Sequence, residues 1–194
     1  MPHTREDAHS IAGTNVLFRD PRFDALRNAM YHTQRRAFFD TLNRFINFLV
    51  ILVGASVVGK VADFLKFDGV WLELGVVFLA TGQLVFDFGK RAMAHESLQR
   101  RYYEVLAEMD AEAQADSEAA KKKWSAKLLT IAADEPMAMR ALDAVAYNQA
   151  LDAIYDDPEI QQQFRQSVSG WQYLLRHICA FQRTNFHTKP QMKS

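Results

Sequence analysis

Two adjacent apolar segments in the first half of the chain constrain its fold more than any other feature. Residues 45–65 have the sequence FINFLVILVGASVVGKVADFL, and residues 70–88 have the sequence VWLELGVVFLATGQLVFDF. Each holds roughly 20 mostly apolar residues, the length that an α-helix needs to cross the hydrocarbon core of a bilayer. Only a short polar break, residues 66–69, separates them. We therefore predict a two-helix transmembrane hairpin over residues 45–89.

A buried helical hairpin inside a soluble all-α protein is the alternative. The charged residues Lys60, Asp63, Glu73 and Asp87 within the two segments favour it. The run Phe48–Val53 argues against it, because this run is apolar on every side of a helix and not along one stripe. The charges also lie near the ends of the segments, where long basic side chains can reach the membrane surface.

Basic residues predict how the hairpin is oriented. They are frequent before the first segment and after the second, whereas the connecting loop offers only Lys66. The positive-inside rule then places both termini in the cytoplasm and the short connecting loop outside. The flanking basic residues that we expect at the membrane surface are Arg35, Arg36, Arg44, Lys90 and Arg91.

Polar residues within the hairpin are candidates for function, because lipid offers them no hydrogen-bond partner. Lys60 and Glu73 are about equally far from the turn, so they are expected to form an ion pair between the helices. A second group lies toward the cytoplasmic side and could line a pore in an oligomer. The alternative is that its members only bond to one another or reach the interface. This group consists of Asn43, Asn47, Gln83 and Asp87.

Small residues recur on each segment and are expected to let membrane helices approach closely. The sequence does not show whether they serve the hairpin itself or contacts in a homo-oligomer. On the first segment they are Ala55, Gly59 and Ala62, and on the second they are Gly75, Gly82 and Gly89.

Charge and cysteine content narrow the remaining possibilities. The chain has 23 basic and 23 acidic residues, so it has no excess of positive charge that would favour nucleic-acid binding. One cysteine, Cys179, is compatible with a reducing cytoplasm. The first ten residues are polar and do not match a secretory signal, so we expect the first apolar segment to act as an uncleaved insertion signal.

Outside the hairpin the sequence predicts helices and two tails. Residues 1–20 and 184–194 are expected to be flexible tails. Asp20-Pro21 resembles a helix start, because Asp caps free amides and Pro suits the first helical position. An amphipathic pre-membrane helix should therefore occupy residues 21–44, and a cytoplasmic helical domain residues 90–183.

The longest periodic segment follows the hairpin. Leu98, Met109, Ala120 and Ile131 are spaced eleven residues apart, as in a nearly straight helix or coiled coil. No Gly or Pro occurs between Gly89 and Pro136. We predict one helix of about 40 residues, roughly 60 Å long, with a break near residues 116–117 as the alternative.

Two further helices are predicted before the C-terminal tail. Asp134-Glu135-Pro136 should end the long helix and start a helix over residues 137–155. Asp156-Asp157-Pro158 marks the next break, and a third helix should follow over residues 160–178, weakened by Gly170. No strand is convincing, so the predicted class is all-α, with a membrane hairpin and a cytoplasmic bundle that contains one long helix.

No motif for catalysis or cofactor binding is present. The sequence lacks a Gly-rich phosphate loop, an HExxH or CxxC motif and a serine elbow. His32, His95 and His177 each lack a second ligand at helical spacing, so no metal site is predicted. Cys179, Trp124 and Tyr102 are expected to be packing residues. The sequence therefore predicts a protein that is not an enzyme and has no cofactor.

Several features together resemble the SLATT family, predicted two-helix membrane effectors of bacterial conflict systems. The resemblance covers residues 24–181. Its elements are the basic, aromatic stretch Arg35/Arg36/Phe38/Phe39, the hairpin, the long helix Glu104–Ile131, the break Asp134-Glu135-Pro136 and Asn148. The resemblance implies oligomerisation through the membrane helices and permeabilisation of the inner membrane, in a cell-suicide or antiviral defence role. It also implies release by a separate sensor or signalling protein, because this chain has no fused sensor domain.

Three functions are therefore considered. The first is a pore-forming membrane effector regulated by its cytoplasmic helices. The second is a membrane-anchored helical scaffold that binds a protein partner. The third is a soluble all-α domain. Detergent dependence of extraction separates the third from the others, and dye influx on expression separates the first from the second.

Overall fold

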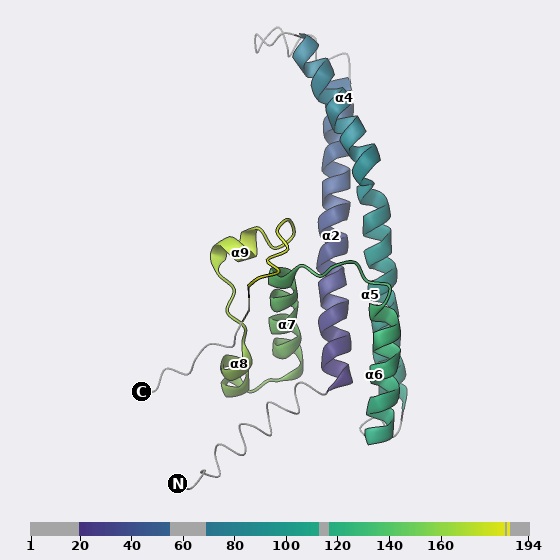
Figure 1. The fold of residues 1–194 in the computed structure, drawn as a ribbon, viewed down its shortest axis with the longest axis vertical. Helices are drawn as coiled ribbons and strands as arrows, with labels where there is room; N and C mark the ends of the chain where they lie inside the picture. The colour runs from purple at the N-terminus through teal and green to yellow at the C-terminus, as the bar shows by residue number, and fades with distance from the viewer. Residues whose placement is uncertain (1–19, 55–68, 113–116, 185, 187–194) are drawn as a thin grey trace, which may run out of the picture. The chain divides into compact units, whose positions relative to one another are not determined.

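The computed structural model describes residues 20–54, 69–112, 117–184 and 186, and most of these residues are helical, with no strand among them (Figure 1). The all-α class is therefore confirmed. The chain divides into two compact units. We call residues 34–96 the hairpin unit and residues 1–33 with 97–194 the body unit. Helices α2 (Pro21–Gly54) and α5 (Phe88–Ala111) contribute residues to both units.

The first helix starts where the sequence predicts. Asp20 precedes Pro21, and its Oδ1 accepts a hydrogen bond of 2.9 Å from the backbone N–H of Arg22. This bond satisfies one of the donors that a helix N-terminus leaves without an intrahelical partner. The helix then continues without interruption through the predicted pre-membrane segment into the first apolar segment.

The predicted long helix is two helices. Helix α5 ends at Ala111, and α6 (Glu118–Ala132) begins after Ser117, whose side chain accepts a hydrogen bond from the backbone N–H of Ala120. The prediction of one helix of about 40 residues was therefore wrong. The alternative break near residues 116–117 was correct, and the capping hydroxyl of Ser117 provides its physical reason.

Helix α6 packs beside α5 in the antiparallel direction. Lys127 Nζ lies 2.6 Å from Glu108 Oε1, and Lys123 Nζ lies 3.1 Å from Glu112 Oε2. The predicted apolar stripe is buried, but its two halves face each other across this helix pair. The resulting core also includes Ala25 and Ala29 of α2. The residues of α5 and α6 that are buried in this core are Leu98, Tyr102, Val105, Met109, Ala120, Trp124, Leu128 and Ile131.

Helices α7 (Arg140–Ile154) and α8 (Pro158–Phe164) also belong to the body unit. Phe23 of α2 packs edge-on against Tyr147, with ring centroids 5.0 Å apart, in a cluster that includes Leu151 and Phe164. A smaller cluster joins Tyr31 to Leu142 and Ala146. The N-terminal part of α2 therefore contributes to the core formed with α5 and α6 and to the core formed with α7 and α8.

The last two predicted helices are shorter than expected. Helix α7 begins at Arg140 and not at residue 137. The single helix predicted over residues 160–178 is divided into α8 and the short α9 (Gly170–Leu174). Ser169 and Gln172 form a capping box that starts α9, so Gly170 is the first residue of a helix and not an interior residue.

Helix α4 (Gly69–Phe86) is the second arm of the hairpin unit. Among the residues that the structure describes, no helix is both long enough and apolar enough to cross a bilayer. The predicted transmembrane hairpin is therefore not supported there and stays a prediction.

Candidate functional site

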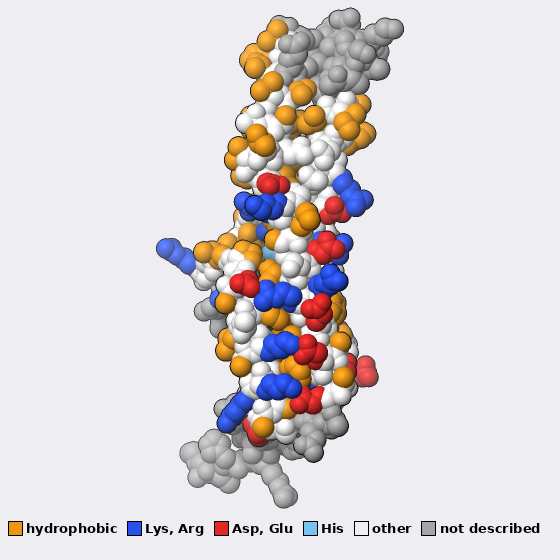
Figure 2. Space-filling model, turned by 90° about the vertical axis from the view of Figure 1, so that its right-hand side faces the viewer, with side chains coloured by type: hydrophobic (Ala, Val, Ile, Leu, Met, Phe, Trp, Pro, Cys, Tyr) orange, Lys and Arg blue, Asp and Glu red, His pale blue; other side chains and the backbone are white. Residues whose placement is uncertain are grey.

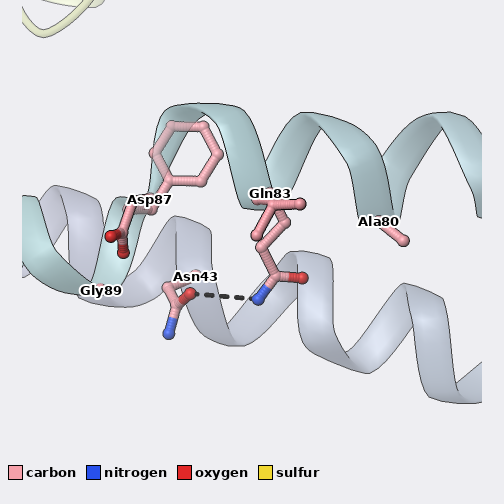
Figure 3. A pocket seen from close by; sticks show the side chains of 7 residues that line it. Asn43, Ala80, Gln83, Asp87 and Gly89 are labelled. Carbon is pink, nitrogen blue, oxygen red and sulfur yellow. Dashed lines mark hydrogen bonds between the residues drawn. The ribbon is translucent and has the colours of Figure 1, made fainter.

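The described part of the hairpin unit brings three of the predicted polar residues together. The Nε2 of Gln83 on α4 donates to Asn47 Oδ1 at 2.7 Å and lies 3.4 Å from Asn43 Oδ1. Figure 3 shows the Gln83 amide directed from α4 toward Asn43 on α2. We call Asn43, Asn47 and Gln83 the amide cluster. The spacing of Asn43 and Asn47 by one helical turn places both within reach of a single side chain on the facing helix.

Asp87, the fourth predicted residue, lies where α4 and α5 meet. Its backbone adopts a left-handed conformation with φ of 41°, which Asp tolerates better than most residues. Its N–H donates to the Gln83 carbonyl at 2.9 Å, and its carboxylate accepts from the backbone N–H of Lys90 at 3.1 Å. Asp87 therefore ends one helix and caps the next.

A pocket of about 380 Å³ lies beside the amide cluster. Asn43, Gln83 and Asp87 provide its polar atoms, and an amide oxygen and a carboxylate there can accept hydrogen bonds from water or contact a cation. The remaining lining residues are Ala80, Leu84, Phe88 and Gly89. Within the described residues no group of three or more His, Cys, Asp or Glu side chains could hold a metal ion.

The five basic residues that were predicted to lie at the membrane surface have different surroundings in the structure. Arg35 is 6% exposed, and its guanidinium lies 4.4 Å from the ring centroid of Phe39. The structure therefore corrects its assignment to the membrane surface, because an aromatic ring covers it. Arg36 pairs with Glu96 at 3.1 Å, Arg44 with Asp40 at 2.9 Å, and Arg91 donates to the Phe86 carbonyl at 2.9 Å. Lys90 is exposed.

Of the three glycines in the predicted stripe, one lies close to a side chain on another described helix and two do not. A Cβ added to Gly89 would lie 3.8 Å from the Asn43 side chain, so this glycine allows a close approach. A Cβ added to Gly75 or Gly82 would meet nothing within 4 Å. These two glycines are therefore not part of a seam between the described helices of the hairpin unit. Because residues 55–68 of the first segment are not described, both a seam within the hairpin and contacts between copies stay predictions.

Some predicted residues lie outside the part of the chain that the structure describes. Ala55, Gly59, Lys60 and Ala62 fall in residues 55–68, and the side chain of Glu73 is likewise not described. The predicted ion pair between Lys60 and Glu73 and the small-residue stripe of the first segment therefore stay predictions.

The sequence analysis missed a buried polar group in the body unit. Glu135 Oε1 lies 3.1 Å from His32 Nε2 and accepts a hydrogen bond from the Tyr102 hydroxyl. The His32 side chain is fully buried, and its ring stacks on that of Tyr102 with centroids 5.7 Å apart. Burial, followed by the bond to Glu135, raises the pKa of Tyr102 above its ordinary value of 10.0. We call His32, Tyr102 and Glu135 the buried triad.

The buried triad explains the predicted break after α6. His32 belongs to α2, Tyr102 to α5, and Glu135 to the segment that follows α6, so one carboxylate ties together three parts of the body unit. A sequence signal did exist: a single His and a single Tyr occur at otherwise apolar positions of two amphipathic helices. It indicated packing and did not reveal the shared acidic partner.

Asn148, which contributes to the resemblance described above, has a clear structural role. Its Nδ2 donates to the Gln166 carbonyl at 2.9 Å, and its Oδ1 accepts from the Gln166 N–H at 2.8 Å. One side chain thus satisfies both backbone groups of a residue in the connection between α8 and α9, where the backbone has no helical partner.

Comparisons of the chain with protein-family models, curated proteins and solved structures found no match. The resemblance to the SLATT family therefore depends only on the features of the sequence itself.

Proposed function

We propose that the chain is a membrane effector whose hairpin unit inserts into the bacterial inner membrane, oligomerises and makes the membrane permeable. The observation that carries the proposal is the exposure of large apolar side chains on α4. Leu84 is 82% exposed, Phe78 is 79% exposed and Val85 is 70% exposed. Water is an unfavourable surrounding for so much contiguous apolar surface, whereas lipid tails or other copies of the hairpin would cover it.

The exposed apolar residues lie mainly along one broad face of α4, at the spacings of three, four and seven residues that share a helix side. This face is open to the surroundings, whereas the apolar stripe of a surface helix in a soluble protein faces a core. On the face drawn in Figure 2, orange side chains gather over α4, whereas basic and acidic side chains gather over α5 and α6. The exposed apolar residues of α2 and α4 are Phe45, Phe48, Ile51, Leu52, Val70, Trp71, Leu74, Val77, Phe78, Leu84, Val85 and Phe86.

The amide cluster supports the permeabilising part of the proposal. Polar side chains in an apolar surrounding are costly unless they bond to one another or contact water. Gln83 bonds to Asn47 in the single chain, and the pocket beside it leaves Asp87 accessible. In an oligomer, several such clusters at one depth would provide hydrogen-bond partners for water and for permeating ions.

Extraction from membranes tests the first part of the proposal. The full chain, expressed in a bacterium, should stay in the membrane fraction after high-salt and alkaline washes and should dissolve in detergent. Recovery in the supernatant without detergent would show that the hairpin unit does not insert, and both membrane functions would then be wrong.

Permeability tests the second part. Expression of the chain, together with any genomic neighbour that activates it, should let a small impermeant dye enter the cells. Gln83→Leu, which removes the donor to Asn43 and Asn47, should reduce the influx several-fold. Gln162→Leu, the same substitution at an exposed position on α8, is the matched control. Membrane retention without influx would instead favour the anchored scaffold.

A further inference from the structure

The last part of the chain has a charge bias that the neutral total conceals. No Asp or Glu occurs after Glu159, although acidic and basic residues are equal in number over the whole chain. This part of the chain is therefore positively charged, and it favours an anionic partner. Its basic residues are Arg165, Arg176, Arg183, Lys189 and Lys193.

The same part exposes a compact apolar group. Trp171, Leu174 and Ile178 are 67%, 65% and 67% exposed. Trp171 and Leu174 are three residues apart and share one side of α9, and Ile178 lies in the turn that follows. Tyr173 is 51% exposed next to them. Exposed Trp, Tyr and Leu side chains beside arginines are typical of protein surfaces that bind the interface of a membrane.

The segment that carries this group is held in place at both ends. Asn148 bonds to the backbone of Gln166 before α9. After the turn, the Ala180 carbonyl accepts from the Arg140 N–H at 3.1 Å, and Gln182 Nε2 donates to the Ala138 carbonyl at 2.9 Å. The apolar group is therefore presented on a fixed backbone, so binding costs little ordering of this segment.

The segment carries two arginines. The Arg176 guanidinium lies 3.9 Å from the ring centroid of Tyr173, and its Nη1 donates to the Tyr173 carbonyl at 2.6 Å. This arrangement holds a delocalised positive charge against the aromatic edge of the apolar group. Arg183 is exposed at the other end of the segment.

We propose that residues 170–183 bind the headgroup region of an anionic lipid bilayer, with Trp171, Leu174 and Ile178 in the interface and Arg176 and Arg183 on lipid phosphates. A second copy of the same surface is a poor occupant, because a two-fold contact would bring like charges together. A lipid surface satisfies both the apolar and the basic side chains without a shaped partner. This inference does not depend on insertion of the hairpin unit.

Tryptophan fluorescence provides a site-specific test. The chain has three tryptophans, and the variant Trp71→Phe/Trp124→Phe keeps only Trp171. The full-length variant is reconstituted with phosphatidylcholine alone or with added phosphatidylglycerol. We expect Trp171 emission to shift to the blue with phosphatidylglycerol, and brominated lipid to quench it. High salt should weaken both effects, because it screens the attraction between arginine and lipid.

Matched charge variants test the arginines. Arg176→Gln/Arg183→Gln should reduce the quenching of Trp171 by roughly half or more, since each basic residue near an anionic surface contributes to binding. Lys121→Gln/Lys122→Gln removes the same amount of charge from α6 and should leave the quenching of Trp171 unchanged. Equal Trp171 emission in neutral and anionic lipid would overturn the proposal. A blue shift that depends on protein concentration without lipid would also overturn it, in favour of self-association.

A second variant separates this inference from the proposed function. Trp124→Phe/Trp171→Phe keeps only Trp71, which lies in the hairpin unit. Quenching of Trp171 without quenching of Trp71 would refute insertion of the hairpin and keep the surface contact. Quenching of Trp71 without any response of Trp171 would refute the surface contact and keep the insertion.

Discussion

At the scale of single residues, the buried triad concentrates polar groups within an apolar core. Partial burial of a carboxylate, such as that of Glu135, costs free energy unless hydrogen bonds compensate for its lost hydration. Glu135 Oε1 has the Tyr102 hydroxyl and His32 Nε2 beside it. Because these groups come from separate helices, the triad favours one register of α2 and α5 over others that apolar contacts alone would tolerate.

Tyr102→Phe tests the hydroxyl of the triad. The phenyl ring keeps the stacking on His32 but removes the bond to Glu135, so the variant should lose about 1–2 kcal/mol of unfolding free energy. Thermal unfolding of the full chain in detergent, followed by circular dichroism, measures the loss. The control is Tyr103→Phe, because Tyr103 is 43% exposed. Equal midpoints for the two variants would contradict the role of the Tyr102 hydroxyl.

Tyrosine ionisation should make the fold sensitive to alkali. Burial raises the pKa of Tyr102, Tyr147 and Tyr155 above the ordinary value of 10.0. Above pH 10 the unfolded chain therefore releases these protons before the folded chain does. The folded state then binds more protons, so the unfolding free energy falls as pH rises.

The measurement is the unfolding midpoint as a function of pH, from neutral to strongly alkaline solution. It should stay level up to about pH 10 and then decline. Tyr102→Phe should start lower and decline less steeply, since one of the titrating groups is gone. A decline as steep as that of the unmodified chain would assign the alkaline sensitivity to other groups.

At the scale of helices, the sequence predicted which residues are buried better than it predicted where helices end. The stripe from Leu98 to Ile131 is buried, yet α5 and α6 form an antiparallel pair and not one rod. The residues at the break favour helix well enough for the pattern to continue through it. Only the Ser117 cap and contacts across the pair distinguish the two arrangements, and those contacts depend on the fold.

One part of the candidate site could be predicted from the sequence, because it depends only on the spacing of residues along two facing helices. Asn43 and Asn47 are one turn apart, and comparable depth in the hairpin brings Gln83 to them. The buried position of Arg35 and the open surroundings of Gly82 were not predictable. Each depends on which side of a helix faces its neighbour. Neither the charge of Arg35 in the amphipathic helix nor the apolar segment around Gly82 reveals that side.

The connection between α8 and α9 should depend on Asn148. Asn148→Ala removes two hydrogen bonds and leaves both backbone groups of Gln166 without their partners, which should cost about 2 kcal/mol. The loosened segment should become a better substrate for trypsin after Arg165. Limited digestion followed by mass spectrometry detects that cleavage. Gln162→Ala, at an exposed position on α8, is the control, and equal cleavage in both would contradict the role of Asn148.

At the scale of the whole molecule, the two units differ in what their surfaces require. The body unit buries large apolar side chains in cores to which several helices contribute, and it exposes a smaller group that includes Trp171, Leu174 and Ile178. The hairpin unit instead exposes large apolar side chains along much of α4. This difference is why the proposed function assigns lipid and further copies of the chain to the hairpin unit.

Assembly through α4 gives the last prediction. Gly82 has open space around its missing Cβ, and Val77 on the same helix is 61% exposed. Leucine is therefore tolerated at both positions within one chain. If the glycines let helices of different copies approach, Gly82→Leu should shift the full chain in detergent toward smaller species, whereas Val77→Leu should not. Light scattering coupled to size-exclusion chromatography measures the masses. Identical distributions for the two variants would exclude a contact between copies at Gly82, and the permeabilising oligomer would then have to assemble through another side of the hairpin.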